Sequence, residues 1–333
     1  MVGVPLAPGS IIGRYEIDDV LGQGGFGITY RAYDHDTGQI VAIKEYFPQS
    51  WAVRDEDGSV MVAGYETEQI FRHNLGRFWE EAETLTRFQH PNIVRVLQRV
   101  MALGTAYIVL DYVPGPTLEK WALTSSPPSQ EAVESFTAAL LDALEVVHMN
   151  GYLHRDLKPQ NILLRDGLPI LIDFGSARVH DPSTVLTAMV TPNYAPFEQY
   201  QTSGQGQGPW TDIYGASATL YRVLTGHPPL DAMTRAMDDS QFEPISTTLA
   251  GRYRRQYLAA LDWGLKVHAS DRPKSVADWR GPLLEGWSVV HGETGLQTQT
   301  AVLPDVLDDP RKSMFGRLRD AIYWPPNRSG KSP

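Results

Sequence analysis

Residues 152–164, YLHRDLKPQNILL, place a carboxylate, an ammonium group and an amide within six positions, directly before an apolar run. Asp156, Lys158 and Asn161 supply these groups. One interpretation is a polar turn that happens to precede a strand. The other is that three groups with different chemistry converge on one phosphate. The carboxylate would orient a hydroxyl, the ammonium would neutralise charge, and the amide oxygen would ligate a hard metal such as Mg²⁺.

A second acidic motif follows at a short distance. Twelve residues after Asn161 comes the tripeptide DFG, in which Asp173 closes the apolar run ILLRDGLPILI at 162–172. A strand–turn–strand hairpin over this run would return Asp173 to the side of Asn161. The pair would then offer two oxygen ligands to Mg²⁺ and a bound triphosphate. The alternative is an unrelated Asp-Phe-Gly turn.

The segment GQGGFG at 22–27 matches the pattern G-x-G-x-x-G through Gly22, Gly24 and Gly27. One reading is a dinucleotide-binding loop, in which the glycines open a helix after a strand. The residues that follow, ITYRAY, alternate and are β-branched or aromatic, which favours a loop between two strands. Such a flap can bring bare backbone N–H groups close to phosphate oxygens. An ordinary glycine-rich hairpin is the alternative for this motif alone.

Lys44 ends the strand-like run VAIK, 17 residues beyond Gly27. A lone lysine at a strand end is usually solvated. It gains a function if a carboxylate holds its head towards a phosphate, and Glu81, on a predicted helix, is the candidate. An ion pair would fix the flexible lysine stem.

Hydrophobic periodicity predicts a β-rich part followed by a helical part, which is an α+β fold with two lobes. The expected strands and helices, in order, are three antiparallel strands over 14–44, a hairpin over 51–64, a helix over about 68–88, strands at 93–100 and 106–113, and helices at 129–151, 211–226 and about 252–266. The expected domains are an N-terminal extension at 1–13, a first lobe at 14–112 with an insertion at about 46–66, a second lobe at 113–283, and a polar tail at 284–333 with an amphipathic stretch at 311–324.

Composition and charge exclude several classes of protein. A net charge of −10 argues against nucleic-acid binding, because phosphate backbones require a basic surface. The lack of cysteine excludes disulfides, thiol catalysis and zinc–thiolate sites. No signal peptide is evident, and no apolar run approaches the roughly 20 residues of a membrane helix. We therefore expect a cytoplasmic protein without a membrane span.

Eight motifs, in order over about residues 14–282, resemble the eukaryotic-like (Hanks-type) serine/threonine protein kinases, particularly their bacterial members. They are GQGGFG, VAIK, EAETLTRFQHPNIV, HRDLKPQN, DFG, TPNYAPFEQY, TDIYGASATLYRVLTG and DRPKSVADW. The resemblance implies the bilobal protein-kinase fold, with a small antiparallel β N-lobe carrying one regulatory helix and a larger α-rich C-lobe. It implies transfer of the γ-phosphate of ATP to serine or threonine of protein substrates, with Mg²⁺ as the metal and Mn²⁺ as an alternative.

Two other classes of protein share parts of this pattern. A pseudokinase, a scaffold that binds nucleotide without turnover, would need a broken Lys44, Asp156, Asn161 or Asp173, and all four are present. A small-molecule kinase shares the lobes but is disfavoured by TPNYAPFEQY and TDIYGASATLYRVLTG, which belong to the protein-substrate pattern.

The resemblance assigns a nucleotide site to both lobes. Its expected members are Leu21, Gly22, Gly24, Gly27, Thr29, Ala42, Lys44, Asp111, Val113 and Leu163. The glycines would cover the phosphates, and Lys44 would hold the α- and β-phosphates. Leu21, Ala42 and Leu163 would sandwich the adenine, whose edge would meet backbone groups of Asp111 and Val113. Leu110 would be the gatekeeper, and Thr29 replaces the valine that is usual at its position.

The same resemblance assigns the catalytic groups. Asp156 would position the substrate hydroxyl, Lys158 would contact the γ-phosphate, and Asn161 and Asp173 would ligate the metal. Glu81 would be the helix partner of Lys44. Its neighbours Glu80 and Glu83 are the alternatives.

Structural roles are implied for four further residues. His154 would be braced near DFG rather than catalytic, and Asp212 would accept hydrogen bonds from the backbone of the catalytic loop. Glu198 and Arg272 would form an ion pair that anchors the segment after the activation loop.

Regulation is expected in the activation loop, between DFG and PFE. Arg155 is placed to pair with a phosphate there, which would order the loop. Thr191 is expected to orient Asp156 and Lys158 rather than to be modified. The candidate phosphorylation sites are Thr187, Ser183 and Thr184. An exposed, unmodified loop threonine is the alternative.

Two segments have no clear function in the sequence. Glu81 stands 37 residues after Lys44, and the segment between them includes the insertion, which is either a small β element braced on the lobe or a docking surface. The tail contains Thr294, Thr298 and Thr300, which could be autophosphorylated and bound by a forkhead-associated domain. A cognate phosphatase is a further expected partner. The stretch 311–324 would pack on its own lobe, or else meet a partner or a membrane surface.

Overall fold

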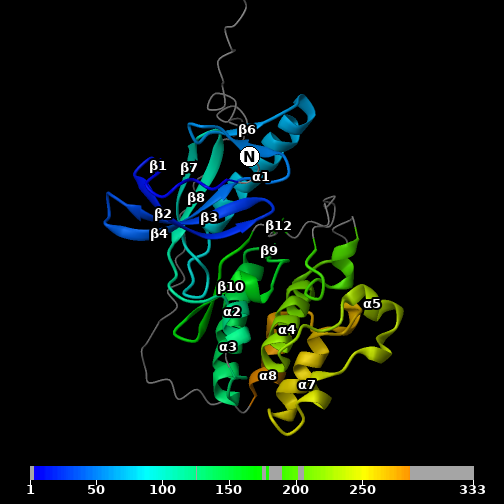
Figure 1. The fold of residues 1–333 in the computed structure, drawn as a ribbon. Helices are drawn as coiled ribbons and strands as arrows, with labels where there is room; N and C mark the ends of the chain where they lie inside the picture. Colours follow the sequence, from blue (N-terminus) through cyan, green and yellow to red (C-terminus); the bar gives the residue numbers. More distant parts are fainter. Residues whose placement is uncertain (1–3, 125, 175–177, 180–189, 202–205, 286–333) are drawn as a thin grey trace, which may run out of the picture. The chain divides into compact units, whose positions relative to one another are not determined.

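The computed structural model describes residues 4–124, 126–174, 178–179, 190–201 and 206–285 (Figure 1). All of them belong to the first of the two units into which the chain divides, Met1–Trp287. The second unit, Ser288–Pro333, lies outside the described residues. Within the described residues, no helix is both long and apolar enough to cross a membrane.

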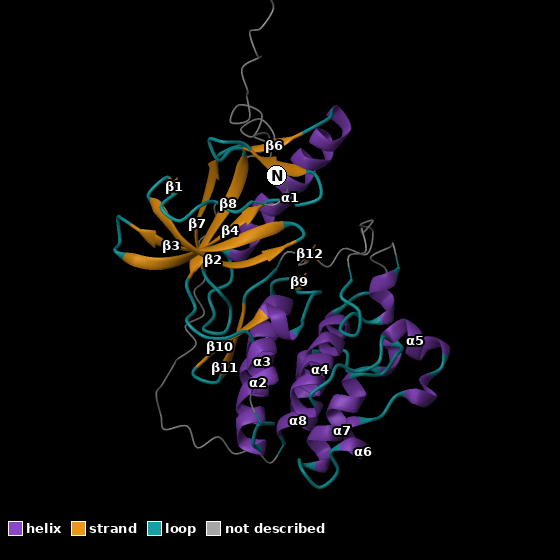
Figure 2. Ribbon diagram, viewed as in Figure 1, coloured by secondary structure: helices purple, strands orange, loops and turns teal. Residues whose placement is uncertain are grey.

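An antiparallel sheet forms the first part of the chain, with strand order β1-β2-β3-β4-β8-β7 (Figure 2). Its strands are β1 (Ile11–Ile12), β2 (Tyr15–Gly24), β3 (Gly27–Asp34), β4 (Gln39–Tyr46), β7 (Val96–Ala102) and β8 (Thr105–Asp111). In β3 the side chains of Ile28, Tyr30 and Ala32 alternate onto the buried face, whereas β8 is buried along most of its length. The predicted hairpin strands are therefore confirmed.

One long helix, α1 (Tyr65–Leu85), packs against this sheet, and its contacts include β8 and β7. The apolar stripe predicted from helical spacing is buried, and it consists of Phe71, Leu75, Phe78, Ala82, Leu85 and Phe88, the last of which lies beyond the end of the helix. The helix begins and ends three residues earlier than predicted. A small hairpin, β5 (Ala52–Arg54) and β6 (Val60–Val62), precedes it, within the range 51–64 predicted for a hairpin.

Helices dominate after Leu118, and Figure 2 shows α3, α4, α7 and α8 gathered together. They are α2 (Leu118–Thr124), α3 (Gln130–Met149), α4 (Pro209–Thr225), α5 (Ala232–Met237), α6 (Ile245–Thr248), α7 (Arg255–Gly264) and α8 (Val276–Leu284). The side chain of Ser129 caps α3 by accepting the N–H of Ala132, and Gly226 ends α4 at φ +87°. The three predicted helices are thus confirmed, with boundaries shifted by a few residues.

Four short strands lie among these helices. They are β9 (Tyr152–Leu153), β10 (Ile162–Arg165), β11 (Leu168–Leu171) and β12 (Arg178–Val179). β10 and β11 form the predicted antiparallel hairpin, in which Ile162 pairs with Leu171. β12 pairs with β9.

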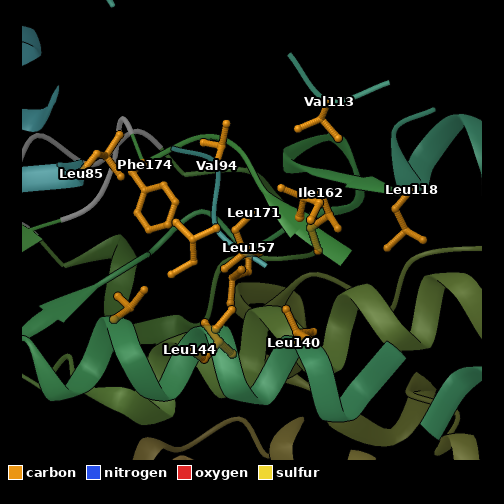
Figure 3. Packing of buried hydrophobic residues seen from close by; sticks show 14 of the residues in the cluster. Leu85, Val94, Val113, Leu118, Leu140, Leu144, Leu157, Ile162, Leu171 and Phe174 are labelled. Carbon is orange, nitrogen blue, oxygen red and sulfur yellow. The ribbon is translucent and has the colours of Figure 1, made fainter. Parts of the chain in front are cut away.

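The buried apolar side chains form one cluster. Leu140 and Leu144 project from α3 towards Leu157 and Leu171 (Figure 3). Leu157 belongs to the segment HRDLKPQN at 154–161, called the catalytic loop here, and Leu171 ends β11. Phe174 continues the same cluster. The floor of the catalytic loop is therefore built on the helical core.

The first described residues also belong to the core, although they were predicted only as an N-terminal extension. Leu6 and Ile12 are 5% and 1% exposed, and the N–H of Leu6 donates to the hydroxyl of Tyr30 at 3.1 Å. The strand β1 extends the sheet by pairing with β2.

Candidate active site

A buried carboxylate on α4 fixes the backbone of the catalytic loop. Asp212 accepts the N–H of His154 at 2.9 Å, the N–H of Arg155 at 2.7 Å and the Nε2 of His148 at 2.8 Å. Arg155 has φ +68°, a left-handed conformation that costs a residue with a side chain roughly 1–3 kcal/mol. Asp212 and the side-chain amide of Gln199, which donates to the carbonyl of Arg155 at 2.7 Å, hold it there.

The charge of Asp212 is stabilised by the same contacts. Burial alone would raise the pKa of this carboxyl group. The hydrogen bond and positive potential of His148, together with the N–H of Arg155, outweigh burial and lower the pKa below its usual value. Asp212 is therefore an ionised acceptor, in the structural position that the sequence indicated.

The carboxylate of Asp156 and the ammonium of Lys158 share one hydroxyl. Lys158 Nζ donates to Thr191 Oγ1 at 2.9 Å, and Thr191 Oγ1 donates to Asp156 Oδ1 at 2.9 Å. Lys158 also lies 2.8 Å from Asp156 Oδ2, which accepts the Nδ2 of Asn161 at the same distance. These contacts hold the carboxylate of Asp156, the ammonium group of Lys158 and the amide of Asn161 together.

Asp173 lies beside Lys44, with 2.7 Å between Lys44 Nζ and Asp173 Oδ1. The next residue, Phe174, is 1% exposed and packs against the rings of Phe88 and His154, with centroid distances of 5.8 and 4.6 Å. Burial of Phe174 therefore directs the preceding carboxylate out of the core and towards the lysine.

Two side-chain oxygens in this region fit a divalent metal. The hairpin β10–β11 and the bond from the N–H of Ile172 to the carbonyl of Asn161 at 3.1 Å bring Asn161 close to Asp173 in the fold. The amide nitrogen of Asn161 is engaged by Asp156, so its oxygen is the atom left for a metal. Among the described residues, no group of three or more acidic, histidine or cysteine side chains is arranged to hold a metal ion. One or two protein oxygens completed by phosphates and water suit Mg²⁺.

His154 has a structural rather than a catalytic role. It is fully buried, and burial lowers its pKa more than the carboxylates of Asp212, Asp156 and Asp173 raise it. The imidazole is therefore neutral at physiological pH, and it packs against the ring of Phe174 in a tilted arrangement.

The glycine-rich segment joins two strands, which decides against the dinucleotide-binding reading. Gly24 pairs with Gly27 at the end of the β2–β3 hairpin. A Cβ atom at Gly27 would lie 2.5 Å from the carbonyl oxygen of Glu45, so only glycine fits there. A Cβ atom at Gly22 or Gly25 would meet nothing within 4 Å, so open space adjoins the loop.

The expected adenine-binding residues lie on neighbouring strands. Thr29 on β3 pairs with Lys44 on β4, and Ala42 on β4 pairs with Leu110 on β8. Leu110 is 7% exposed, and Leu21 on β2 is 41% exposed. Asp111 ends β8, and Val113 follows it. Leu163 on β10 forms a bridge with Thr117, two residues beyond Gly115.

Gly115 allows the segment that follows β8 to lie close to β10. At φ +145° an added Cβ would lie 2.0 Å from the carbonyl oxygen of Leu164, so no side chain fits there. The N–H of Leu164 donates to the carbonyl of Pro116 at 3.0 Å.

A buried ion pair anchors the segment that follows the activation loop. Arg272 donates to both carboxylate oxygens of Glu198, at 2.7 and 3.1 Å, as the sequence predicted for this pair. Thr211 adds a third hydrogen bond to Glu198 at 3.0 Å. The 3₁₀ turn η2 (Phe197–Tyr200) is thereby tied to α4, and it positions Gln199 against the catalytic loop.

Several predicted residues cannot be placed. The side chain of Glu81, on α1, is not among the described ones, so its pair with Lys44 stays a prediction. The candidate sites Thr187, Ser183 and Thr184, and the tail threonines with the stretch 311–324, also lie outside the described residues.

Three contributors were missed in the sequence. His148 and Gln199 support the catalytic loop, and Arg77 on α1 lowers the pKa of Arg155 by its positive charge. Gln199 directly follows the glutamate of PFE, which was a signal within a recognised motif. His148 and Arg77 lie in no recognised motif, and a single polar residue on a helix is too common to indicate a role.

Comparison with known proteins assigns the family. The model of the protein kinase domain matches residues 15–257. Serine/threonine-protein kinase PknK of Mycobacterium bovis is 32% identical over 284 residues, which cover 83% of this chain and 24% of that protein. Serine/threonine-protein kinase PkaA of Streptomyces coelicolor is 29% identical over 329 residues, covering 94% of this chain and 58% of that protein.

A solved structure, the apo form of PpkA-294, is similar at 33% identity with a TM-score of 0.75, over 84% of this chain and 99% of that one. The predicted bilobal α+β fold is thereby confirmed. The chain spans about a quarter of the length of PknK and just over half that of PkaA. It belongs to the protein kinase family, among the bacterial eukaryotic-like (Hanks-type) serine/threonine kinases.

Proposed function

We propose that the chain is a serine/threonine protein kinase that transfers the γ-phosphate of Mg·ATP to hydroxyl groups of proteins. The observation that carries the proposal is the hydrogen-bonded chain from Lys158 through Thr191 to Asp156. It couples the group that would meet the γ-phosphate to the group that would orient the attacking hydroxyl. Family membership implies use of ATP and a divalent metal, and the choice of Mg²⁺ over Mn²⁺ is part of the proposal.

Each polar group has one task in this mechanism. Asp156 accepts a hydrogen bond from the hydroxyl of the incoming serine or threonine, and so aligns the hydroxyl oxygen with the γ-phosphorus. Lys158 neutralises charge on the transferred group. Thr191 keeps the two at a fixed separation. Asn161 and Asp173 would hold Mg²⁺, which when bound shields the phosphate charges.

Nucleotide binding is assigned to residues of the sheet and of β10. Gly22, Gly24 and Gly27 cover the phosphates, and Lys44 contacts them from β4, with Glu81 as its partner on α1. The adenine contacts are Leu21, Thr29, Ala42, Asp111, Val113 and Leu163. The buried gatekeeper Leu110 and the open space beside Gly22 and Gly25 support this assignment.

The direct test is steady-state transfer to a generic protein substrate. Asp156→Asn should lower the rate by roughly 10²–10⁴, because it removes the positioned base and the charge that pairs with Lys158. ATP affinity should stay intact, since Asp156 is not among the residues assigned to the nucleotide site. Asp166→Asn, in the exposed turn between β10 and β11, is the matched control and should keep the wild-type rate. Removal of divalent metal by a chelator should abolish transfer.

Other outcomes would favour a different function. ATP binding without transfer by the wild type would support a pseudokinase scaffold, although all four residues whose loss would define one are present. Phosphorylation of a small alcohol but not of protein would indicate a small-molecule kinase.

Control by phosphorylation is part of the proposal. The pKa of the half-buried Arg155 is lowered, chiefly because burial disfavours its charged form. The negative charge of Asp212 raises this pKa, and the positive charge of Arg77 lowers it. Two guanidinium groups that repel each other would be stabilised by an added phosphate. Thr187 is the preferred acceptor, with Ser183 and Thr184 as alternatives.

Partners and location are proposed on the same basis. Protein substrates follow from the family. A forkhead-associated domain that reads phosphothreonine in the tail and a cognate phosphatase are further candidates. The use of ATP supports a cytoplasmic location.

A further inference from the structure

The insertion that follows β4 makes direct contact with the tip of the glycine-rich loop. The N–H of Phe47 donates to the carbonyl of Phe26 at 2.9 Å, and the N–H of Gln49 donates to that of Gly25 at 3.0 Å. The side-chain amide of Gln49 donates to the carbonyl of Gly24 at 2.7 Å. Three consecutive carbonyl groups of the loop are thus held from one side.

These bonds determine the direction of the neighbouring N–H groups. In a planar trans peptide the C=O and N–H groups point in opposite directions. With the carbonyls of Gly24 and Gly25 turned towards the insertion, the N–H groups of Gly25 and Phe26 point away from it. Backbone N–H groups aimed together in this way form an anion-binding concavity.

The support beneath Gln49 is rigid. The N–H groups of Trp51 and Ala52 both donate to the carbonyl of Pro48, at 3.2 and 2.9 Å, which closes a turn around Gln49. The ring of Trp51 packs edge-on against Phe71 of α1, with 6.5 Å between ring centroids. Gln49 therefore sits on a turn that is braced against the helix.

A buried ion pair secures the other end of the same segment. Arg54 donates to both carboxylate oxygens of Glu45, at 2.7 and 3.0 Å, and the hydroxyls of Tyr30 and Tyr107 donate to the same carboxylate at 2.7 and 2.8 Å. The side chains of Arg54 and Glu45 are 6% and 0% exposed. Detaching the insertion would leave a buried charge without its partner, so the segment stays in place.

We infer that Gln49 is a positioning residue for the nucleotide, acting through the glycine-rich loop, and that the insertion sets the shape of this loop before ATP binds. The inference rests on the proposed function, because it assigns the loop to the phosphates of ATP. A loop held in its binding shape binds ATP without an ordering cost, so the tether affects ATP binding more than turnover.

The test uses Gln49→Met, which keeps the length of the side chain but removes the donor, and Gln49→Glu, which replaces the donor by an acceptor. Loss of one hydrogen bond should raise KM for ATP by about two- to tenfold, with kcat within about twofold and KM for the protein substrate unchanged. Gln39→Met is the control, because Gln39 is exposed at the opposite end of β4. The affinity for a fluorescent ATP analogue should fall by the same factor as KM rises.

The outcomes separate this inference from the proposed function. Gln49 variants that bind ATP as tightly as Gln39→Met, or that lose kcat and Tm without a change in KM for ATP, would show that the insertion is only a brace. If the wild type binds the analogue but transfers no phosphate, the proposed function fails, while the measured affinities still decide the inference. A wild type that binds no nucleotide overturns both.

Discussion

At the scale of single residues, Thr191 is the side chain that bridges Lys158 and Asp156, in addition to the direct contact between these two groups. It accepts a hydrogen bond from Lys158 and donates one to Asp156. A hydroxyl is the smallest group that can do both at once. Position 191 therefore constrains the chemistry of the site without contributing a charge.

Replacement of Thr191 tests this coupling. Thr191→Val keeps the shape but loses both hydrogen bonds, each to a charged group, and we expect kcat to fall about 10- to 100-fold. Thr191→Ser should restore most of the rate because the hydroxyl returns. KM for ATP should not change in either variant. Equal loss in valine and serine variants, measured as steady-state transfer, would mean that the hydroxyl is not the active group.

The buried His154 should make the protein sensitive to acid. Its pKa in the folded protein lies below the ordinary value of 6.5, because burial disfavours the charged imidazole. The unfolded chain therefore binds more protons below pH 6.5, and stability is lost as the pH falls from there towards the folded pKa. The loss can reach about 1.4 kcal/mol per pH unit.

Chemical unfolding at several pH values measures this effect. His154→Phe removes the titrating group but keeps a ring against Phe174. The free energy of unfolding should therefore depend less on pH below the ordinary histidine pKa of 6.5, between about pH 6.5 and pH 5. His73→Phe, at an exposed position of α1, should keep the wild-type slope. Parallel slopes for all three proteins would contradict the account.

At the scale of elements, the hairpin β5–β6 is joined to the sheet by the pair of Glu45 and Arg54. Arg54→Met would leave a fully buried carboxylate without its cation, and we expect a loss of about 3–5 kcal/mol in the free energy of unfolding. Arg72→Met breaks an exposed pair with Glu68 on α1 and should cost at most about 1 kcal/mol.

A double variant separates the charge from the contact. Replacing Glu45 and Arg54 together by methionine should be less destabilising than Arg54→Met alone, since no buried charge is left. Denaturant unfolding of the four proteins gives the comparison. If Arg54→Met costs no more than Arg72→Met, the pair does not hold the insertion.

The elements that could be predicted are those with a long periodic pattern. The buried stripe of α1, from Phe71 to Leu85, follows directly from helical spacing. Helices of four to seven residues, such as α6 (Ile245–Thr248), and the two-residue strand β1 are too short to show a period. Leu6 is buried, and its N–H donates to the hydroxyl of Tyr30, which lies 24 residues away, so no local pattern reveals this contact.

At the scale of the whole molecule, the candidate site residues that the sequence could predict stand in recognised motifs, whereas their isolated polar partners could not be predicted. Asp156, Asn161 and Asp173 stand in motifs whose order is informative. Gln49 reaches Gly24 only because β3 and β4 pair in one register, and no local pattern reveals that. Tertiary contacts of single polar residues are therefore the part of the site that required the structure.

The central claim is that this arrangement transfers phosphate. Intact-mass measurement after incubation with Mg·ATP, followed by mapping of the modified sites, tests it on the protein alone. We predict phosphate on the wild type, with Thr187 among the sites, and almost none on Asp156→Asn in the same time. Equal phosphorylation of both proteins, or none on either despite measurable ATP binding, would contradict the account.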